Sequence, residues 1–288
     1  MLLWLVPLAV VILAILAYWE LVVAEGVHLG PGVVAYLYDL VARRYNNIKQ
    51  FDPSYEAWFL SEPLACVLHD IPMPLVLDVA TGTGRLPITL LAQGGFRGRV
   101  IALDSSRQML AEAAHVTFGA PDRLALIWQS ANRLPFDDDT FDAVACLEAL
   151  EFMPDTGQAL SEIVRVLRPG GVTLLTNRVG PWAKFLHGHT QSRTAFEAML
   201  AMLGLERIQT QTWQVEYDLV WARKPGSGRN GSAKLLAHIL RCPQCKGPMT
   251  HGEDSFTCGT CGRAYPVAPD GVVEMMRQQT KNQFRQER

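Results

Sequence analysis

Four cysteines near the C-terminus have the spacing of a metal site. Cys242 and Cys245 form one CxxC pair, Cys258 and Cys261 form a second, and twelve residues separate the two pairs. Four thiolates at this spacing are typical of one tetrahedral zinc ion, and neighbouring glycines supply the tight turns that such loops need. Because four thiolates fill the coordination shell, we expect a structural zinc and not a catalytic one.

A second group of residues is suited to binding a nucleoside. An apolar run ends near Asp78, and Gly82 and Gly84 follow it, so the backbone can approach a ligand at the edge of a sheet. The glycines alone also suit a plain tight turn. The next strand ends at Asp104, whose carboxylate can accept both hydroxyls of a ribose. Arg85 follows the glycines where a phosphate-binding loop has Lys-Ser/Thr, so the sequence favours a nucleoside cofactor without a pyrophosphate.

Alternating strands and helices must position these residues. Seven runs are predicted as strands, at 74–80, 99–103, 124–128, 141–146, 172–176, 206–210 and 215–222. Helices are predicted at 31–45, 55–68, 84–93, 107–115, 156–167 and 194–203. The alternation indicates an α/β fold with a Rossmann-like, doubly wound, mostly parallel seven-stranded sheet. The last two strands follow each other closely and are expected to be antiparallel.

The chain begins with an uncharged apolar run, Leu2–Tyr18. About twenty residues at 1.5 Å each cover roughly the 30 Å core of a bilayer, so we expect an N-terminal transmembrane helix. A cleaved signal peptide would need basic residues before the run, and none precede it. A buried helix of a soluble domain is the remaining alternative. The first basic residues, Arg43, Arg44 and Lys49, favour a single-pass membrane protein with its main domain in the cytoplasm.

Composition and length limit the organisation of the chain. Its 288 residues are 49% hydrophobic with a formal net charge of −2, which gives no global reason to expect nucleic-acid binding. The expected segments are a transmembrane anchor at 1–24, a helical cap at 25–73, a cofactor-binding core at 74–224, a linker at 225–233, a four-cysteine zinc ribbon at 234–276 and a disordered tail at 277–288.

Four stretches in order resemble the class I S-adenosylmethionine-dependent methyltransferases, of the type found in quinone biosynthesis and among small-molecule enzymes. They begin at Val76, Ala102, Leu134 and Glu162 and read VLDVATGTGR, ALDSSRQML, LPFDDDTFDAV and EIVRVLRPGG. The resemblance extends from about Tyr36 to Pro225. It implies methyltransferase activity and S-adenosylmethionine as the cofactor.

The resemblance also implies roles for single residues. It places Asp78, Ala80, Gly82 and Gly84 at the methionine part of the cofactor, Asp104 at the ribose, Ser105 and Met109 beside the adenine, Ser130 and Ala131 at the adenine edge, and Cys146 beside the sulfonium. Two positions depart from the family, since Ala80 replaces a glycine and Ser130 replaces an aspartate. At Ser130 a neutral hydrogen bond to the adenine, worth about 1 kcal/mol, replaces a charged one worth about 1.5–3 kcal/mol. We therefore expect weaker cofactor binding.

The cysteine region resembles a small zinc-ribbon family. Its members are partner subunits of tRNA and protein methyltransferases, or are fused to enzymes. The resemblance rests on residues 240–249, 261–267 and 270–273. It implies a structural zinc, and it makes a protein or RNA a candidate partner for this region.

These features predict a membrane-anchored methyltransferase whose acceptor is small or lipophilic, such as a quinone or a lipid-like precursor. Two alternatives stay open: a methyltransferase of protein or RNA that uses the zinc ribbon for recognition, and a cofactor-binding adapter without turnover. No catalytic residue is assigned. Glu148 and Glu151 follow the fourth strand, where a general base would lie, and His187 and His189 are candidates for the acceptor pocket. All four residues are also compatible with solvent-exposed positions that have no role in catalysis.

Overall fold

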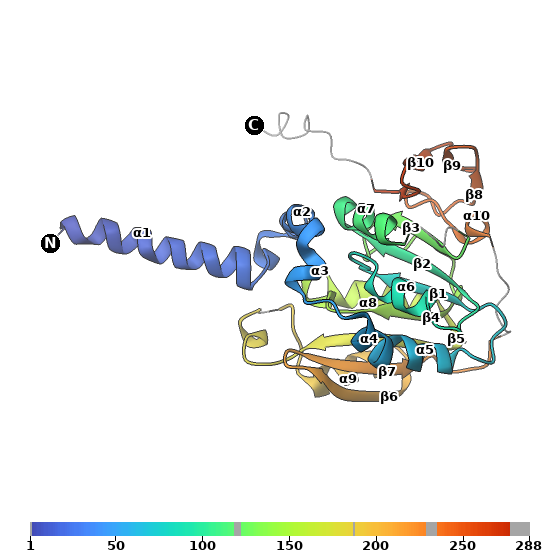
Figure 1. Ribbon diagram of the computed structural model, residues 1–288, viewed down its shortest axis with the longest axis horizontal. Coiled ribbons are helices and arrows are strands. Elements are labelled where there is room, and N and C mark those ends of the chain that lie inside the picture. The colour runs from blue at the N-terminus through green and yellow to red at the C-terminus, as the bar shows by residue number, and fades with distance from the viewer. Residues whose placement is uncertain (1, 118–121, 187, 229–234, 277–288) are drawn as a thin grey trace.

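The computed structural model describes residues 2–117, 122–186, 188–228 and 235–276. Helix α1 (Leu2–Tyr18) continues into the π-helical turn η1 (Trp19–Val23) and projects away from the rest of the protein (Figure 1). The 18 residues Val6–Val23 are long and apolar enough to cross a membrane, and none of them is buried. A signal sequence passes the same test of length and composition. The predicted tail at 277–288 lies outside the described residues.

The main sheet of the described chain has eight strands in the order β11-β3-β2-β1-β4-β5-β7-β6. Seven of them belong to the core: β1 (Leu75–Val79), β2 (Arg99–Asp104), β3 (Leu124–Trp128), β4 (Phe141–Cys146), β5 (Leu167–Arg178), β6 (Glu206–Gln214) and β7 (Tyr217–Arg223). β1 to β5 are parallel, whereas β7 pairs antiparallel with both β5 and β6. The predicted Rossmann-like sheet and its antiparallel final pair are confirmed.

Helices cover both faces of this sheet (Figure 1). They are α4 (Pro53–Glu56), η4 (Ala57–Ser61), α5 (Glu62–Val67), α6 (Arg85–Leu91), α7 (Arg107–Val116), α8 (Thr156–Val166) and α9 (Arg193–Met202). On one face Leu60 and Leu90 pack against the strands, and on the other Leu160 and Phe196 do so. Because both faces are covered, the parallel strands read as nearly continuous apolar runs.

Among the elements whose bounds differ from the sequence prediction, two have a clear local cause. The helix expected at 55–68 is divided into α4, η4 and α5, and Pro63 in the first turn of α5 has no backbone N–H to continue the preceding helical ladder. The strand expected at 172–176 is longer, because β5 begins at Leu167 and includes the Pro-Gly-Gly stretch. Leu167 pairs with Phe141, and a register shift in this pairing accommodates the additional residues.

The cysteine region forms a second, smaller sheet with its own helical turn. Its elements are α10 (Leu236–Ile239), β8 (Met249–His251), β9 (Ser255–Cys258) and β10 (Ala264–Pro266). The three strands are antiparallel in the order β10-β9-β8.

This small domain is built into the main sheet. Its last strand, β11 (Val273–Glu274), pairs parallel with β3 and forms the eighth strand, which the sequence did not predict. The Arg241 N–H donates to the carbonyl of Pro135 at 2.8 Å. Ile239 and Met275 are buried in the same hydrophobic cluster as the core strands. The two parts of the chain therefore share one core.

The segment after α1 lies over the carboxyl edge of the sheet. It consists of η2 (Val27–Leu29), α2 (Pro31–Val41), η3 (Ala42–Arg44) and α3 (Tyr45–Ile48). Asp39 accepts a hydrogen bond from the Ser106 hydroxyl at 2.5 Å, and Asn46 accepts one from the Thr83 hydroxyl at 2.6 Å. These bonds hold the segment on the loops that follow β1 and β2.

Candidate active site and metal centre

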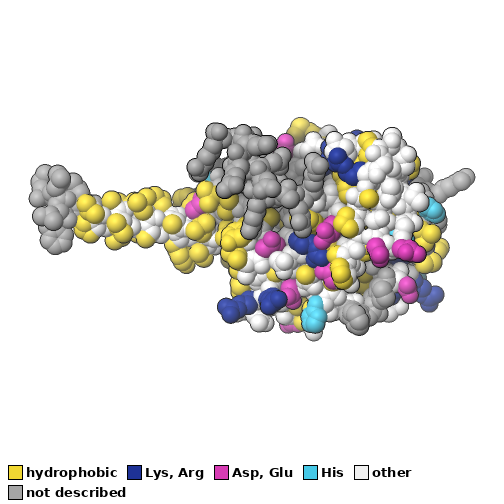
Figure 2. Space-filling model, turned by 90° about the horizontal axis from the view of Figure 1, so that it is seen from above, with side chains coloured by type: hydrophobic (Ala, Val, Ile, Leu, Met, Phe, Trp, Pro, Cys, Tyr) yellow, Lys and Arg dark blue, Asp and Glu magenta, His cyan; other side chains and the backbone are white. Residues whose placement is uncertain are grey.

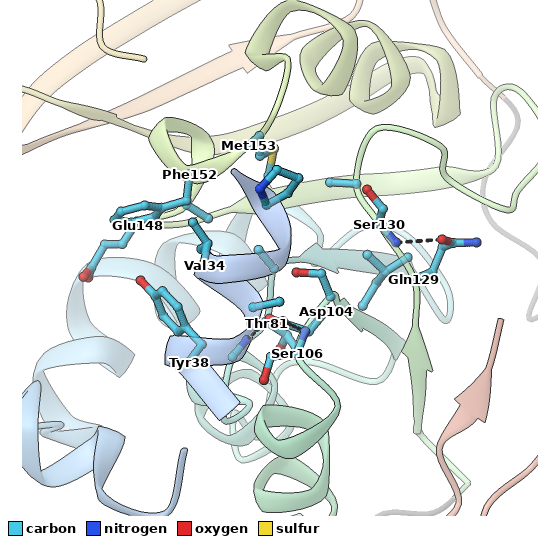
Figure 3. Close-up of a pocket in the computed structure, with 18 of the residues that line it drawn as sticks. Val34, Tyr38, Thr81, Asp104, Ser106, Gln129, Ser130, Glu148, Phe152 and Met153 are labelled. Carbon is cyan, nitrogen blue, oxygen red and sulfur yellow. Dashed lines mark hydrogen bonds between the residues drawn. The ribbon is translucent and has the colours of Figure 1, made fainter. Parts of the chain in front are cut away.

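A cavity of about 690 Å³ lies at the carboxyl ends of the parallel strands, between the sheet and α2 (Figure 3). This volume suits a cofactor or a small ligand, and the position is the usual one in doubly wound sheets. Seven of the ten residues expected at the cofactor line it: Asp78, Ala80, Gly82, Asp104, Ser105, Ser130 and Ala131. The structure thus brings them around one space, and their contacts with a cofactor stay a prediction.

Asp104 ends β2 with a buried carboxylate. Its two oxygens accept from the backbone N–H groups of Gly82 and Ser106, each at 2.8 Å. Burial raises the pKa of Asp104 to about 6, although these backbone donors oppose the shift. The carboxylate is therefore held in place and keeps further lone pairs for hydroxyl donors on the cavity side.

The loop after β1 curls around a second buried carboxylate. Asp78 accepts from the Thr81 hydroxyl at 2.6 Å, and burial raises the pKa of Asp78 to about 7. Ala80 and Gly82 have positive φ values of 57° and 56°. A left-handed conformation costs a residue with a Cβ roughly 1–2 kcal/mol, so the alanine at a position where the family has glycine is a strained substitution.

The loop after β3 lies across the cavity from Glu148, as Figure 3 shows. Ser130, which stands where the family has aspartate, lines this side, and its backbone N–H donates to the Gln129 side-chain oxygen at 2.7 Å. Gln129 is buried and adds a polar side chain that the sequence did not single out. The loop after β3 thus presents polar but uncharged side chains to the predicted adenine side of the site.

Three predicted cofactor residues do not line the cavity. Cys146 ends β4 as expected, yet it is fully buried in the hydrophobic core, and burial raises the pKa of its thiol well above the usual value. Leu147 and Glu148 line the cavity in its place. Met109 is buried in α7, and Gly84 lies so near Ala113 that a Cβ would approach its methyl group to 3.3 Å. Cys146 and Met109 therefore contribute by packing, and Gly84 by its close approach to α7.

Several lining residues come from segments that carried no local signal. Trp213 belongs to β6, and Met276 follows β11. Arg107, the first residue of α7, also lines the cavity. It lies inside a motif that was recognised, so, unlike Trp213 and Met276, it could have been predicted from the sequence. It contacts Glu274 at 3.0 Å and Asp270 at 2.9 Å, and these pairs connect the cavity wall to the zinc-ribbon region.

The part of the cavity remote from Ser130 is largely aromatic. Tyr38 lies 5.8 Å from Tyr45 and 5.9 Å from Phe152, measured between ring centroids. The Tyr38 hydroxyl donates to Glu25 at 2.6 Å. Burial and this carboxylate raise the pKa of Tyr38 well above its usual value, so the phenol stays neutral. Such a wall suits a flat apolar ligand.

Glu148 is the carboxylate on this side of the cavity. Its φ of 50° is unusual for a residue with a Cβ, and its N–H donates to the Thr176 hydroxyl at 2.6 Å. The carboxylate lies 3.6 Å from both Lys49 and Arg85. The backbone therefore fixes the position of a carboxylate that is paired with Arg85 in the cavity wall and with Lys49 beside it.

The other candidate bases lie elsewhere. Glu151 is buried and accepts from the Tyr217 hydroxyl at 2.5 Å, away from the cavity lining. His189 makes an edge contact with His28, with ring centroids 6.0 Å apart. His187 lies outside the described residues.

The four cysteines converge on one point. Their sulfur atoms all lie within 4.8 Å of one another, with Cys242 to Cys261 at 3.7 Å and Cys245 to Cys258 at 3.4 Å. A tetrahedral zinc with bonds of about 2.3 Å requires sulfur separations of about 3.8 Å, so the arrangement fits zinc. A Cβ on Gly247 would lie 2.7 Å from the Cβ of Thr260 and 3.0 Å from the Cys258 sulfur, which explains that glycine.

Two family models match the chain in the regions just described. Residues 76–171 match a methyltransferase domain, and residues 233–268 match the Trm112p-like proteins. The first range contains β1 to β4, whose ends form the cavity. The second contains the four converging cysteines.

Curated relatives name the kind of methyltransferase that the chain is similar to. Demethylmenaquinone methyltransferase of Symbiobacterium thermophilum is 33% identical over 154 residues, which cover 52% of this chain and 61% of that protein. The ubiquinone/menaquinone biosynthesis C-methyltransferase UbiE of Desulfotalea psychrophila is 32% identical over 164 residues, covering 56% and 64%. The chain thus spans somewhat less than two thirds of the length of these relatives.

Solved structures agree on the fold at low sequence identity. One chain of a complex between the Haloferax volcanii Trm112 methyltransferase activator and a candidate methyltransferase superposes with a TM-score of 0.52 at 21% identity, covering 66% of this chain and 98% of that one. The cyclase SpnF superposes with a TM-score of 0.55 at 19% identity, covering 69% and 97%. Because a protein named for another reaction shares the fold, activity must be argued from the site.

The fold is that of the class I S-adenosylmethionine-dependent methyltransferases, and residues 76–171 match a methyltransferase domain. More particularly, the chain joins such a domain, related to the quinone methyltransferases, to a Trm112-like zinc-ribbon domain.

Proposed function

We propose that this protein is a membrane-anchored, S-adenosylmethionine-dependent methyltransferase that methylates a quinone precursor. The observation that carries the proposal is one cavity lined by two kinds of residue. Asp78 and Asp104 line it together with an aromatic wall and Glu148. The relatives named for quinone methylation support the acceptor class.

The cofactor end fits a nucleoside that carries an amino acid. S-adenosylmethionine supplies an activated methyl group on a sulfonium centre. Asp104 is placed to accept the ribose hydroxyls, and the loop Asp78–Gly82 is placed to meet the methionine part. Methyl transfer then needs chiefly alignment and exclusion of water, which the covering segment 31–48 provides.

Unpaired donors in the cavity wall suit an acceptor that carries oxygens. In the part of the chain that the structure describes, Arg85 Nε and Trp213 Nε1 are buried without a hydrogen-bond partner. Both residues line the cavity. A buried donor left unpaired costs about 1–3 kcal/mol, so a ligand oxygen that accepts from it is favoured. The oxygens on a quinol ring meet this requirement while the ring packs on aromatic side chains.

We assign Glu148 as the group that takes the proton released when the acceptor gains a methyl group. Glu148→Gln should lower kcat by roughly 100-fold, the typical size of a general-base contribution, and should leave cofactor affinity unchanged. Steady-state kinetics together with calorimetry of cofactor binding measures both. Glu62→Gln, an exposed carboxylate outside the cavity lining, serves as the matched control. A variant that keeps kcat and only raises KM would assign Glu148 to acceptor binding instead.

We also propose that α1 anchors the protein as a single-pass span, with the main domain in the cytoplasm. The exposed apolar helix supports this, as does the lipophilic acceptor class. The division into an anchor at 1–24, a cap at 25–73, a core at 74–224, a linker at 225–233 and a zinc ribbon at 234–276 is proposed with it. An intact N-terminus in protein extracted from membranes would exclude a cleaved signal sequence.

The function is tested with the full chain in nanodiscs of synthetic phospholipid that contains no quinone. The sample receives a membrane lipid extract that contains unmethylated quinols, together with S-adenosylmethionine labelled in its methyl group. We expect the label in the lipid fraction, on a quinone, and no label with Asp104→Ala. Label found only in added protein or RNA would favour the macromolecular alternative. Cofactor binding without any labelled product would favour an adapter.

A further inference from the structure

The base of α1 is packed against the loop that follows β5. Trp19 stacks on His28 at 5.6 Å between centroids, and the same histidine meets His189 of that loop. Val27 and Leu186 are buried in one small cluster. Phe152 packs against this cluster and also lines the cavity. The helix base, the loop and the cavity wall are therefore in direct contact.

Beside this junction the loop exposes two aromatic side chains. Trp182 is 49% exposed and Phe185 is 45% exposed, and their rings lie 6.0 Å apart. The turn between β6 and β7 adds Val215, which is 89% exposed. That turn is joined to the loop, because the Val179 N–H donates to the Glu216 carbonyl at 2.7 Å. We call Trp182, Phe185 and Val215 the apolar rim.

The rim lies on the side of the globular body from which α1 projects. Figure 1 shows the loop after β5 extending from the body on that side, below the helix base. In Figure 2 the hydrophobic surface of the described helix continues onto the body at its base. The carboxyl ends of the parallel strands, where the cavity lies, face the same way.

A cation beside the rim suits a lipid surface. Lys184 lies between Trp182 and Phe185 in the sequence, and its ammonium is 5.6 Å from the Phe185 ring centre. Tryptophan and other aromatic residues beside lysine are typical of the boundary between headgroups and acyl chains. The ammonium suits an anionic headgroup.

We infer that the apolar rim inserts into the headgroup region of the same bilayer that α1 enters. The inference rests on the proposed membrane anchor but not on methyl transfer. The bilayer would then reach the cavity wall, because Trp213 lines the cavity two residues before Val215. A lipophilic acceptor could pass from the membrane to the cavity without crossing water.

The test uses the full chain in vesicles of phosphatidylcholine and phosphatidylglycerol that carry bromine near the headgroup. Bromine quenches tryptophan at that depth, and the chain has seven tryptophans. We expect Trp182→Phe to remove part of the quenchable emission. Trp58→Phe, which replaces a tryptophan that is 67% exposed on η4, should leave the quenched part unchanged.

Two results would overturn the inference. Quenching that is the same in Trp182→Phe and in the wild type would place this side chain in water. Shielding of Trp182 from acrylamide in detergent, increasing with protein concentration, would show a rim covered by a second copy of the chain. Neither measurement needs turnover, so the rim and the proposed reaction can fail separately.

Discussion

Replacing Asp104 by alanine should weaken S-adenosylmethionine binding by roughly 100-fold to 10,000-fold. The carboxylate can accept two hydroxyl donors from the ribose, each worth about 1.5–3 kcal/mol when the acceptor is charged, and together these bonds correspond to that range. The same carboxylate orders the cofactor loop through the Gly82 and Ser106 N–H groups. Calorimetry of the purified full chain measures the dissociation constant. Unchanged affinity would contradict the whole interpretation of the cavity.

Two controls separate lost contacts from lost structure. Asp104→Asn keeps a neutral acceptor of the same size, so its affinity for S-adenosylmethionine should lie between that of Asp104→Ala and that of the wild type. Asp138→Ala removes a surface carboxylate whose side chain is 73% exposed and should leave affinity unchanged. The melting temperature of each variant reports whether the fold persists.

The pH dependence of binding gives an independent check of the same carboxylates. The pKa is about 6 for Asp104 and about 7 for Asp78, so both become ionised between pH 5 and 8. Affinity for the cofactor should therefore rise with pH through this window. The free energy of unfolding without cofactor should move the other way. Burial raises the pKa values of Asp78 and Asp104 above those of the unfolded chain. The part of the folding free energy that their neutral carboxyl groups contribute is therefore complete below about pH 4, and it is lost as the pH rises through 6 to 7.

The parts of the fold that were predicted correctly are those with a local cause. The strand ends at Asp78 and Asp104 follow buried apolar runs. Helix α7 begins after an N-cap residue, Ser106, whose hydroxyl accepts from the Met109 N–H at 3.1 Å. The zinc ligands were predictable for the same reason, because CxxC spacing is itself a short-range geometric constraint. Ordered motifs therefore located the cofactor half of the cavity.

The parts that were missed depend on contacts between distant segments. β11 has only two residues and exists because its backbone pairs with β3. Trp213 and Met276 reach the cavity from strands placed by the whole sheet. Cys146, expected beside the sulfonium, is buried in the core because strand β4 is buried on both faces, and its position at the strand end did not reveal which way its side chain points.

The missed contacts also change the role expected of the zinc ribbon. The sequence left open, as an alternative, a zinc ribbon that recognises a protein or RNA. In the structure its residues Leu240 and Met275 are buried in the core that they share with the methyltransferase domain, and Met276 lines the cavity. The face of the ribbon that packs on this core is not free for another partner. Its first effect should therefore be on the stability and cofactor binding of its own chain.

Loss of zinc should accordingly unfold the ribbon and weaken cofactor binding at a distance. Structural zinc contributes about 10–16 kcal/mol in small zinc domains, which is as large as the roughly 5–15 kcal/mol that stabilises a typical domain. Without it, β11 would leave β3, and Arg107 would lose Asp270 and Glu274 beside the cavity. We expect Cys258→Ser, or chelation of the wild type, to lower the melting temperature by more than 10 °C, since about 1 kcal/mol corresponds to a few degrees.

Metal analysis, thermal unfolding and cofactor calorimetry on the same samples test this coupling. The wild type should contain one zinc per chain, as four closely spaced thiolates require. Cys66→Ser, which changes an exposed cysteine outside the cluster, is the matched control and should keep metal, stability and affinity. Restoring zinc to the chelated wild type should recover cofactor binding, whereas Cys258→Ser should not recover. If metal is lost while cofactor affinity stays constant, the ribbon and the cavity are independent, and the shared core does not transmit the state of the zinc site to the cofactor.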